Sequence, residues 1–265
     1  SHNGEHVTLH IRHMPGGLFT DQVFSTMKER DILRFEGPHG SFFLREDSDK
    51  PIILLASGTG FAPIKALMEQ LIHLKSERQV VLYWGGRRPS DLYMSALCEE
   101  WAASLPNFRY VPVISDAQAE DQWQGRTGLV HRAVMEDFPD LSGHQVYACG
   151  VPVMVESARR DFIARCGLPE TEFFSDAFTP ATPSSDGSSR PMSRRRRIAT
   201  DSAVVEIATH RPSALTAIVF KPRLWPIGLA VSSPLSSQIF TVLSQLPAAR
   251  LRYTYTTPDA PRLPL

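Results

Sequence analysis

The stretch PIILLASGTGFAPIKALMEQL, residues 51–71, decides the fold. It begins as a continuous apolar run, breaks at Gly58 and Gly60, and resumes with apolar residues at the three- and four-residue spacing of a helix. A short apolar run that ends in glycines predicts a strand buried on both faces. Pro63 suits the first turn of the helix that follows, because a missing N–H costs little there. The stretch therefore predicts one strand and one helix of a sheet that is covered by helices.

The same alternation of strand and helix continues to about residue 180. Further strands are expected at QVVLYWG (79–85), NFRYVPVIS (107–115), HQVYACG (144–150) and EFF (172–174). Helices are expected at residues 62–74, 91–103, 129–136 and 153–166. Apolar strands separated by helices are typical of a parallel sheet covered on both faces. Residues 49–180 are thus predicted to form an α/β domain, a doubly wound parallel sheet of five strands that binds a nucleotide.

Residues 1–48 follow a different pattern. HVTLHIR (6–12) alternates between apolar and polar residues, as a half-buried strand does. MPGGLFT (14–20) predicts a glycine turn and a short helix that Thr20 could cap, and DILRFEGPHGSFFL (31–44) predicts two short strands around a Gly-Pro turn. So few strands cannot close a barrel alone. This segment is expected to be a partial antiparallel β-barrel.

Residues 181–265 differ from both preceding segments. They carry a net charge of +7, against −7 for residues 1–180, and hold 10 of the 21 prolines. ATPSSDGSSRPMSRRRR (181–197) is linker-like, although LTAIVF (215–220) and QIFTVLSQL (238–246) could form a short strand and helix. We expect a disordered or poorly packed basic tail. A nucleic-acid-binding tail is the alternative, but the arginine run lacks interleaved aromatic residues.

Several classes of protein are excluded by composition. No apolar run reaches the roughly 18 residues of a membrane span, and SHNGEHVTLH (1–10) is too polar for a signal peptide, so a cytoplasmic protein without a membrane partner is expected. Cys98, Cys149 and Cys166 are odd in number and far apart. This spacing excludes a disulfide framework, a zinc site of paired cysteines and a plant-type iron–sulfur site.

The glycine break and three further strand ends indicate where a ligand would bind. In a doubly wound sheet, ligands lie at the carboxyl ends of the strands, and the positive end of the helix after Gly58 suits a pyrophosphate. The break matches neither GxGxxG nor a phosphate-binding loop, so a plain turn is the alternative. The other strand ends are YWGGRRPSDLYM (83–94), PVISDAQ (112–118) and VYACGVP (146–152). Four polar or glycine-rich segments are therefore expected on one rim.

Taken together, the motifs resemble those of the ferredoxin-NADP reductase-like flavoprotein reductases. The resemblance covers about residues 5–180 and rests on SGTGFAP (57–63), YWGGRRPSDLY (83–93), GRTGLV (125–130), VYACGVPVMV (146–155) and FFSDAF (173–178). It is strongest to the CDP-6-deoxy-3,4-glucoseen reductase type and to reductase components of oxygenases. It implies an oxidoreductase that carries electrons from NAD(P)H through FAD to an iron–sulfur centre or an acceptor protein.

The resemblance also implies roles for individual residues. The SGTG turn (57–60), with Gly58, Thr59 and Gly60, would cradle the nicotinamide end and the pyrophosphate. Cys149, the implied catalytic residue, and Gly150 would lie beside the nicotinamide, although relatives often have two prolines next and this chain has Val151 before Pro152. Without the resemblance, Cys149 is simply a small buried residue.

At the adenosine end of the nucleotide, the implied binding residues are Arg87, Ser115 and Asp116. Arg87 would bind the ribose or a phosphate; alternatively it is a solvated arginine. A carboxylate beside the ribose accepts hydroxyl hydrogen bonds and repels a 2′-phosphate, so Asp116 favours NADH over NADPH. The positive charge of Arg87 or Arg88 could offset this repulsion of a 2′-phosphate. The alternative for Asp116 is a solvated loop residue without a role in binding.

For the flavin, PGGLFT (15–20) resembles the family's second flavin motif, with Gly17 and Thr20 near the FAD pyrophosphate, and Phe178 resembles the aromatic residue near the flavin ring. A helix cap and core packing are the alternatives. The family's arginine-aromatic-serine motif is missing from residues 1–50, so the chain is expected to be a fragment that enters the flavin domain partway. An iron–sulfur cluster is then expected only in a missing domain or partner. The alternative to a working reductase is a nicotinamide-binding module without flavin or turnover.

Overall fold

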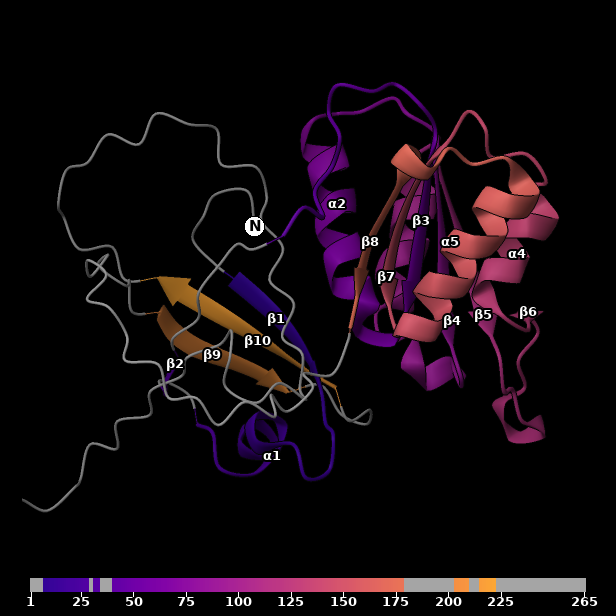
Figure 1. Cartoon of the computed structure of the whole chain (residues 1–265). Coiled ribbons are helices and arrows are strands. Elements are labelled where there is room, and N and C mark those ends of the chain that lie inside the picture. Colours follow the sequence, from indigo (N-terminus) through magenta and orange to yellow (C-terminus); the bar gives the residue numbers. More distant parts are fainter. Residues whose placement is uncertain (1–6, 29–30, 34–39, 179–202, 210–214, 223–265) are drawn as a thin grey trace, which may run out of the picture.

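The computed structural model describes residues 7–28, 31–33, 40–178, 203–209 and 215–222, which contain two sheets (Figure 1). The larger sheet has the strand order β6-β5-β4-β3-β7-β8, and all of its neighbouring strands are parallel. Its strands are β3 (Ile52–Ser57), β4 (Val80–Gly86), β5 (Phe108–Ile114), β6 (Arg126–Thr127), β7 (Gln145–Gly150) and β8 (Phe173–Ala177). The expected doubly wound parallel architecture is confirmed.

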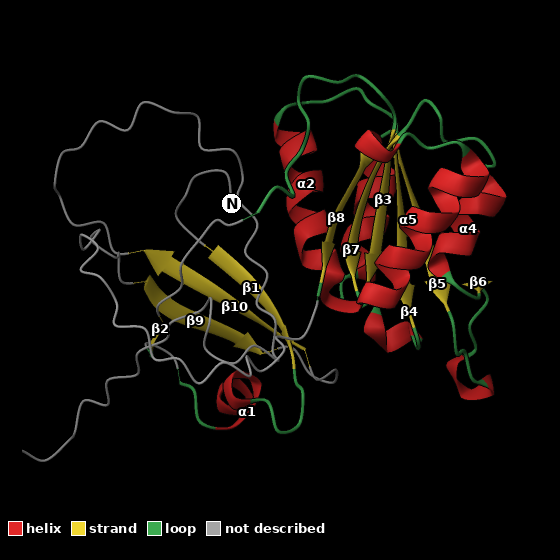
Figure 2. Ribbon diagram, viewed as in Figure 1, coloured by secondary structure: helices red, strands yellow, loops and turns green. Residues whose placement is uncertain are grey.

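Helices cover both faces of this sheet, as Figure 2 shows. They are α2 (Phe61–His73), α3 (Ser95–Ser104), α4 (Val130–Asp137) and α5 (Pro152–Cys166). Strand β3 supplies both cores, because its alternate side chains point to opposite faces. Ile52 and Leu54 pack in one core with α2 and α3, whereas Ile53 and Leu55 pack in the other with α4 and α5. Each such burial stabilises the fold by roughly 1.5–3 kcal/mol, which explains the continuous apolar run.

Two features of this sheet differ from the sequence-based expectation. The sheet has six strands rather than five, because residues 126–127 form β6 and pair with the end of β5. A strand of two residues has no hydrophobic periodicity and so leaves no signal. The helix expected from residue 91 begins at Ser95. Residues before it form a separate 3-10 helix, η2 (Pro89–Asp91), because the Asp91 carboxylate accepts the backbone N–H groups of Arg87 and Arg88.

The smaller sheet is antiparallel and has the strand order β1-β10-β9-β2. Its strands are β1 (Val7–Arg12), β2 (Ile32–Leu33), β9 (Ala203–Thr209) and β10 (Leu215–Pro222), and α1 (Leu18–Ser25) follows β1. The possible strand at 215–220 lies within β10, and β9 and β10, from the segment expected to be disordered or poorly packed, pair with β1 and β2. Residues 42–44 are not a strand. The arginine run and the possible helix at 238–246 lie outside the described residues. The division into segments 1–48, 49–180 and 181–265 stays a prediction.

Candidate functional site

The carboxyl ends of β3, β4, β5 and β7 lie at one edge of the large sheet because these strands are parallel and in close register. Ser57 is paired with Gly85, and Ala56 is paired with Cys149. The loops beyond the strands are joined by hydrogen bonds: Asp116 N–H donates to Arg87 O (3.0 Å), and Val151 N–H donates to the Ser57 hydroxyl (3.1 Å). The structure therefore brings the four predicted segments together on one rim.

Gly58 has the backbone conformation expected of a ligand-binding turn. Its φ is +52°, in the left-handed region, and the turn Gly58–Gly60 forms the 3-10 helix η1 that leads into α2, with Thr59 between the glycines. A Cβ built on Gly58 would meet only the end of the Arg12 guanidinium, at 3.9 Å. The backbone here faces open space beside a cation and the positive end of α2, which suits an anionic group such as a pyrophosphate.

Gly60 has a different physical reason to be glycine. It is buried, and a Cβ built on it would lie 2.2 Å from Cys149 O and 2.7 Å from Gly150 Cα. The start of α2 is thus packed directly on the end of β7. Sequence reasoning grouped both glycines as ligand contacts, but the structure uses Gly60 to pack backbone against backbone.

Ser57, the first residue of the predicted SGTG turn, joins the same two strand ends. Its hydroxyl accepts the Val151 N–H, and it lies where a side chain on Gly150 would have to go: a Cβ there would be 2.1 Å from Ser57 Oγ. Gly150 also has φ +142°, which disfavours any other residue.

Cys149 is fully buried within β7. Burial raises the pKa of its thiol well above the ordinary value, and the Asp176 carboxylate raises it further. The side chain is therefore a neutral thiol near pH 7 and is unsuited to act as a thiolate. Its role in hydride transfer stays a prediction.

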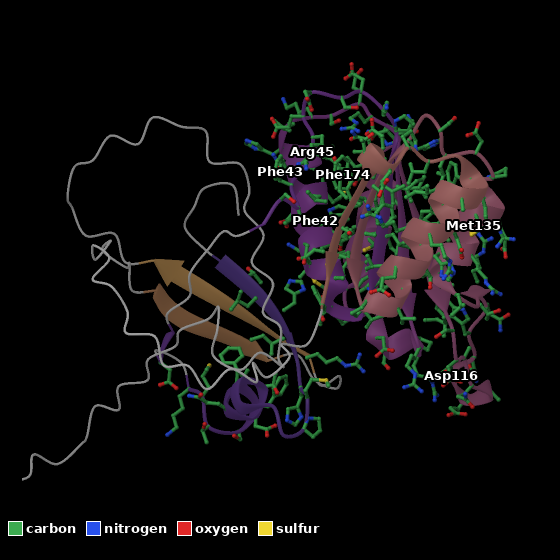
Figure 3. All side chains as sticks on the ribbon, in the orientation of Figure 1. Phe42, Phe43, Arg45, Asp116, Met135 and Phe174 are labelled. Carbon is green, nitrogen blue, oxygen red and sulfur yellow. The ribbon has the colours of Figure 1, made fainter. Side chains whose placement is uncertain are left out.

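The two adjacent arginines after β4 differ in their surroundings. The Arg87 side chain is 78% exposed and meets Asp116 at 3.6 Å. Arg88 donates three hydrogen bonds to carboxylates on the loop after β5. Ser115 lies beside them and donates its hydroxyl to Gly86 O (3.2 Å). Figure 3 shows Asp116 on the loop beyond β5, at the opposite end of the sheet from Arg45.

The residues predicted to bind flavin fall in two places. Gly17 is the N-cap of α1, so the prediction that Thr20 caps this helix is wrong. Thr20 is fully buried inside α1, where its hydroxyl donates to Met14 O (3.0 Å) and so stabilises the preceding turn. Phe178 lies beside the rim, since its N–H donates to Gly150 O (2.9 Å). The predicted flavin-side aromatic residue therefore follows the strand next to the predicted nicotinamide motif.

A contact between the two sheets was missed by the sequence analysis. His10 of β1 and the Tyr93 hydroxyl share a hydrogen bond of 2.5 Å, and the Tyr93 ring packs edge-on against Trp84 and Phe61. Trp84 in turn donates its indole N–H to Gly58 O (3.1 Å). This chain of contacts links β1 to the glycine turn.

Comparisons with known proteins agree with this geometry. Residues 54–160 match the oxidoreductase NAD-binding domain family. The chain is 49% identical over 175 residues to the CDP-6-deoxy-L-threo-D-glycero-4-hexulose-3-dehydrase reductase of Yersinia pestis, covering 66% of this chain and 52% of that protein. It is 34% identical over 182 residues to the NAD(P)H-flavin reductase of Aliivibrio fischeri, covering 67% and 75%. The crystal structure of the Amycolatopsis cytochrome P450 reductase GcoB is similar, with 32% identity, a TM-score of 0.57 and coverage of 65% and 52%.

The chain therefore belongs to the ferredoxin-NADP reductase-like flavoprotein reductases, as its motifs indicated. The family and the fold predicted from the sequence are confirmed. The chain spans about half the length of the curated relatives that it matches first. Among the described residues, no helix combines the length and apolar character needed to cross a bilayer, and no cluster of metal-ligating side chains is present.

Proposed function

We propose that the chain binds NADH at this rim and passes hydride to FAD, from which electrons continue to an iron–sulfur centre or an acceptor protein. The observation that carries the proposal is the convergence of the open turn at Gly58, the pair Arg87 and Asp116, and the strand end at Gly150 on one edge of the sheet. Relatives named as a dehydrase reductase and a flavin reductase support the same chemistry.

The residues of the rim fit a nicotinamide dinucleotide. The turn at Gly58, with the Arg12 guanidinium above it, offers positive potential to a pyrophosphate. The exposed Asp116 carboxylate can accept hydrogen bonds from ribose hydroxyl groups. At the end of β7, Gly150 carries no side chain and Phe178 is bonded to it through its backbone, so an uncharged ring would meet no charged group of these two residues. FAD, when bound, supplies the hydride acceptor, while the protein binds and orients the reactants.

The flavin side fits less completely. Gly17 is the N-cap of α1, where a pyrophosphate would bind, but the Thr20 hydroxyl donates to the carbonyl oxygens of Met14 and Gly17 instead of facing a ligand. This observation favours a second candidate, a module that binds NADH without supporting turnover. Under either candidate the iron–sulfur centre belongs to another domain or partner. We place the protein in the cytoplasm, where NADH is abundant, and assign no role to nucleic acid or a membrane.

The two candidates are separated by anaerobic titration of the chain, mixed with FAD, with NADH while the visible flavin absorbance is followed. The first candidate predicts protein-dependent, saturable loss of flavin absorbance. Binding of NADH by calorimetry without loss of absorbance would support the second candidate. Absence of NADH binding would overturn both. Gly58→Val should weaken NADH binding, because a valine disfavours the left-handed backbone of the turn and its side chain fills the open space there. Gly143→Ala serves as the control, since it adds a methyl group in open space away from the rim.

A further inference from the structure

The loop that follows β5 holds one of the two rim arginines in a fixed position. Arg88 Nε donates to Asp121 Oδ2 (2.7 Å) and Arg88 Nη2 donates to Asp121 Oδ1 (2.8 Å), a bidentate pair. Arg88 Nη2 also donates to Glu120 Oε1 (2.9 Å). Hydrogen bonds between charged groups in this planar fork are among the strongest that side chains make. Arg88 is therefore committed to the acidic pair Glu120–Asp121.

The acidic pair is itself well positioned. Both residues belong to the 3-10 helix η3 (Ala119–Asp121), and Asp121 Oδ2 additionally accepts the Gln118 N–H (2.9 Å). The Asp121 side chain is only 14% exposed. Hydrogen bonds from Arg88 lower the pKa of Asp121, and a backbone hydrogen bond followed by the Arg88 hydrogen bond lowers that of Glu120. Both carboxylates are therefore ionised at neutral pH.

The arrangement gives each rim arginine its own acidic partner. Arg87 is paired with Asp116, and Arg88 is paired with Glu120 and Asp121. These five side chains together carry one net negative charge. A phosphate monoester brings about 1.5 to 2 further negative charges and requires cations with free donors. Arg88 already uses its Nε and Nη2 donors on the two carboxylates, so this end of the rim is unfavourable to a 2′-phosphate.

We propose that Glu120 and Asp121 are specificity-determining residues that bind Arg88 and thereby make the nucleotide site reject the 2′-phosphate of NADPH. The proposal rests on the proposed function and goes beyond the effect of Asp116. Asp116 repels a 2′-phosphate, and a free Arg88 guanidinium could attract that phosphate. The acidic pair prevents this attraction by binding Arg88. Neutralising the acidic pair would release a guanidinium next to Arg87, and two adjacent arginines form a fork that matches phosphate geometry.

The test compares the binding of ADP with that of adenosine 2′,5′-bisphosphate by calorimetry, using the full chain without FAD. The double variant Glu120→Gln/Asp121→Asn keeps side-chain shape and leaves an oxygen to accept the Gln118 N–H. It should bind the bisphosphate about tenfold more tightly than the wild type, because one or two charge-assisted hydrogen bonds become available. ADP affinity should change by less than about twofold. The gain should shrink at high salt, because these groups lie at the surface.

Three controls make the result specific. Adding Arg88→Gln to the double variant should abolish the gain. Glu170→Gln removes a carboxylate from a similar exposed pair, with Arg159, and should leave the ratio of the two affinities unchanged. Glu120→Gln alone removes the more exposed of the two Arg88 partners and should give a smaller gain, which tests the proposal if the double variant does not fold.

The proposal is overturned if the double variant gains no bisphosphate affinity, if the gain survives the addition of Arg88→Gln, or, where the double variant does not fold, if Glu120→Gln gives no gain. In each of these cases ADP still binds, so the nucleotide site stands. If ADP binds to neither the wild type nor any variant, the nucleotide site itself fails and this proposal fails with it.

Discussion

Replacing Gly60 with alanine should destabilise the protein severely, even when no nucleotide is present. The added Cβ would lie 2.2 Å from Cys149 O and 2.5 Å from the Cys149 carbonyl carbon. Both atoms belong to the backbone of β7, an interior strand of the sheet, and cannot move away by rotating a side chain. Overpacking of a core costs about 1–3 kcal/mol. Because the clash is between backbone segments, we expect a loss at the upper end, about 3 kcal/mol.

The matched control is Gly143→Ala. Gly143 lies in an exposed turn, and a Cβ there has no atom within 4 Å. Its substitution should change the free energy of unfolding by less than about 0.5 kcal/mol. In urea unfolding followed by tryptophan fluorescence, a slope of about 2 kcal/mol per molar implies a fall in midpoint of about 1.5 M for Gly60→Ala. Equal midpoints for the two variants would refute the packing role assigned to Gly60.

The remaining predictions concern His10, Asp116 and Cys149. Burial, and then the charge of Lys65, lowers the pKa of His10 to about 4 in the folded protein. The unfolded chain therefore binds a proton at His10 more tightly than the folded protein does. As the pH falls from 7 to 4.5, the free energy of unfolding should fall by about 2–3 kcal/mol. Urea unfolding at both pH values should show this fall in the wild type and not in His10→Gln, and equal falls would contradict the assignment. Asp116→Ala should raise kcat/KM for NADPH relative to NADH, since a carboxylate near the ribose is lost; an unchanged ratio would remove Asp116 from the ribose site. Cys149→Ala should slow hydride transfer in stopped-flow measurements while nucleotide affinity stays within a few fold, and unchanged transfer would leave Cys149 with a packing role only.

Much of the larger sheet was predictable because its signals are local. The apolar run of β3 supplies side chains to two cores, and this double burial is what an uninterrupted run indicates. The parallel arrangement then places every strand's carboxyl end on one edge, so the rim follows from the order of strands and helices. For this reason Gly58, Arg87, Asp116 and Gly150 could be assigned to one site without coordinates.

The parts that could not be predicted depend on contacts between distant segments. Gly60 is needed because it meets Cys149, and His10 is bound by Tyr93; neither partner can be identified from local spacing. Thr20 was expected to cap a helix from its residue type, but it is buried within that helix, where its hydroxyl bonds to the preceding turn. The difference between Arg87 and Arg88 arises from the loop after β5, whose conformation has no sequence periodicity.

The most direct test of the proposed function is steady-state oxidation of NADH by the purified chain, with added FAD and with ferricyanide as electron acceptor. A sample with FAD and no protein measures the background. If the chain is a reductase, oxidation depends on the protein and saturates with NADH. A folded chain that binds NADH but gives only the background rate would contradict the proposed reductase activity and leave the chain as a nicotinamide-binding module.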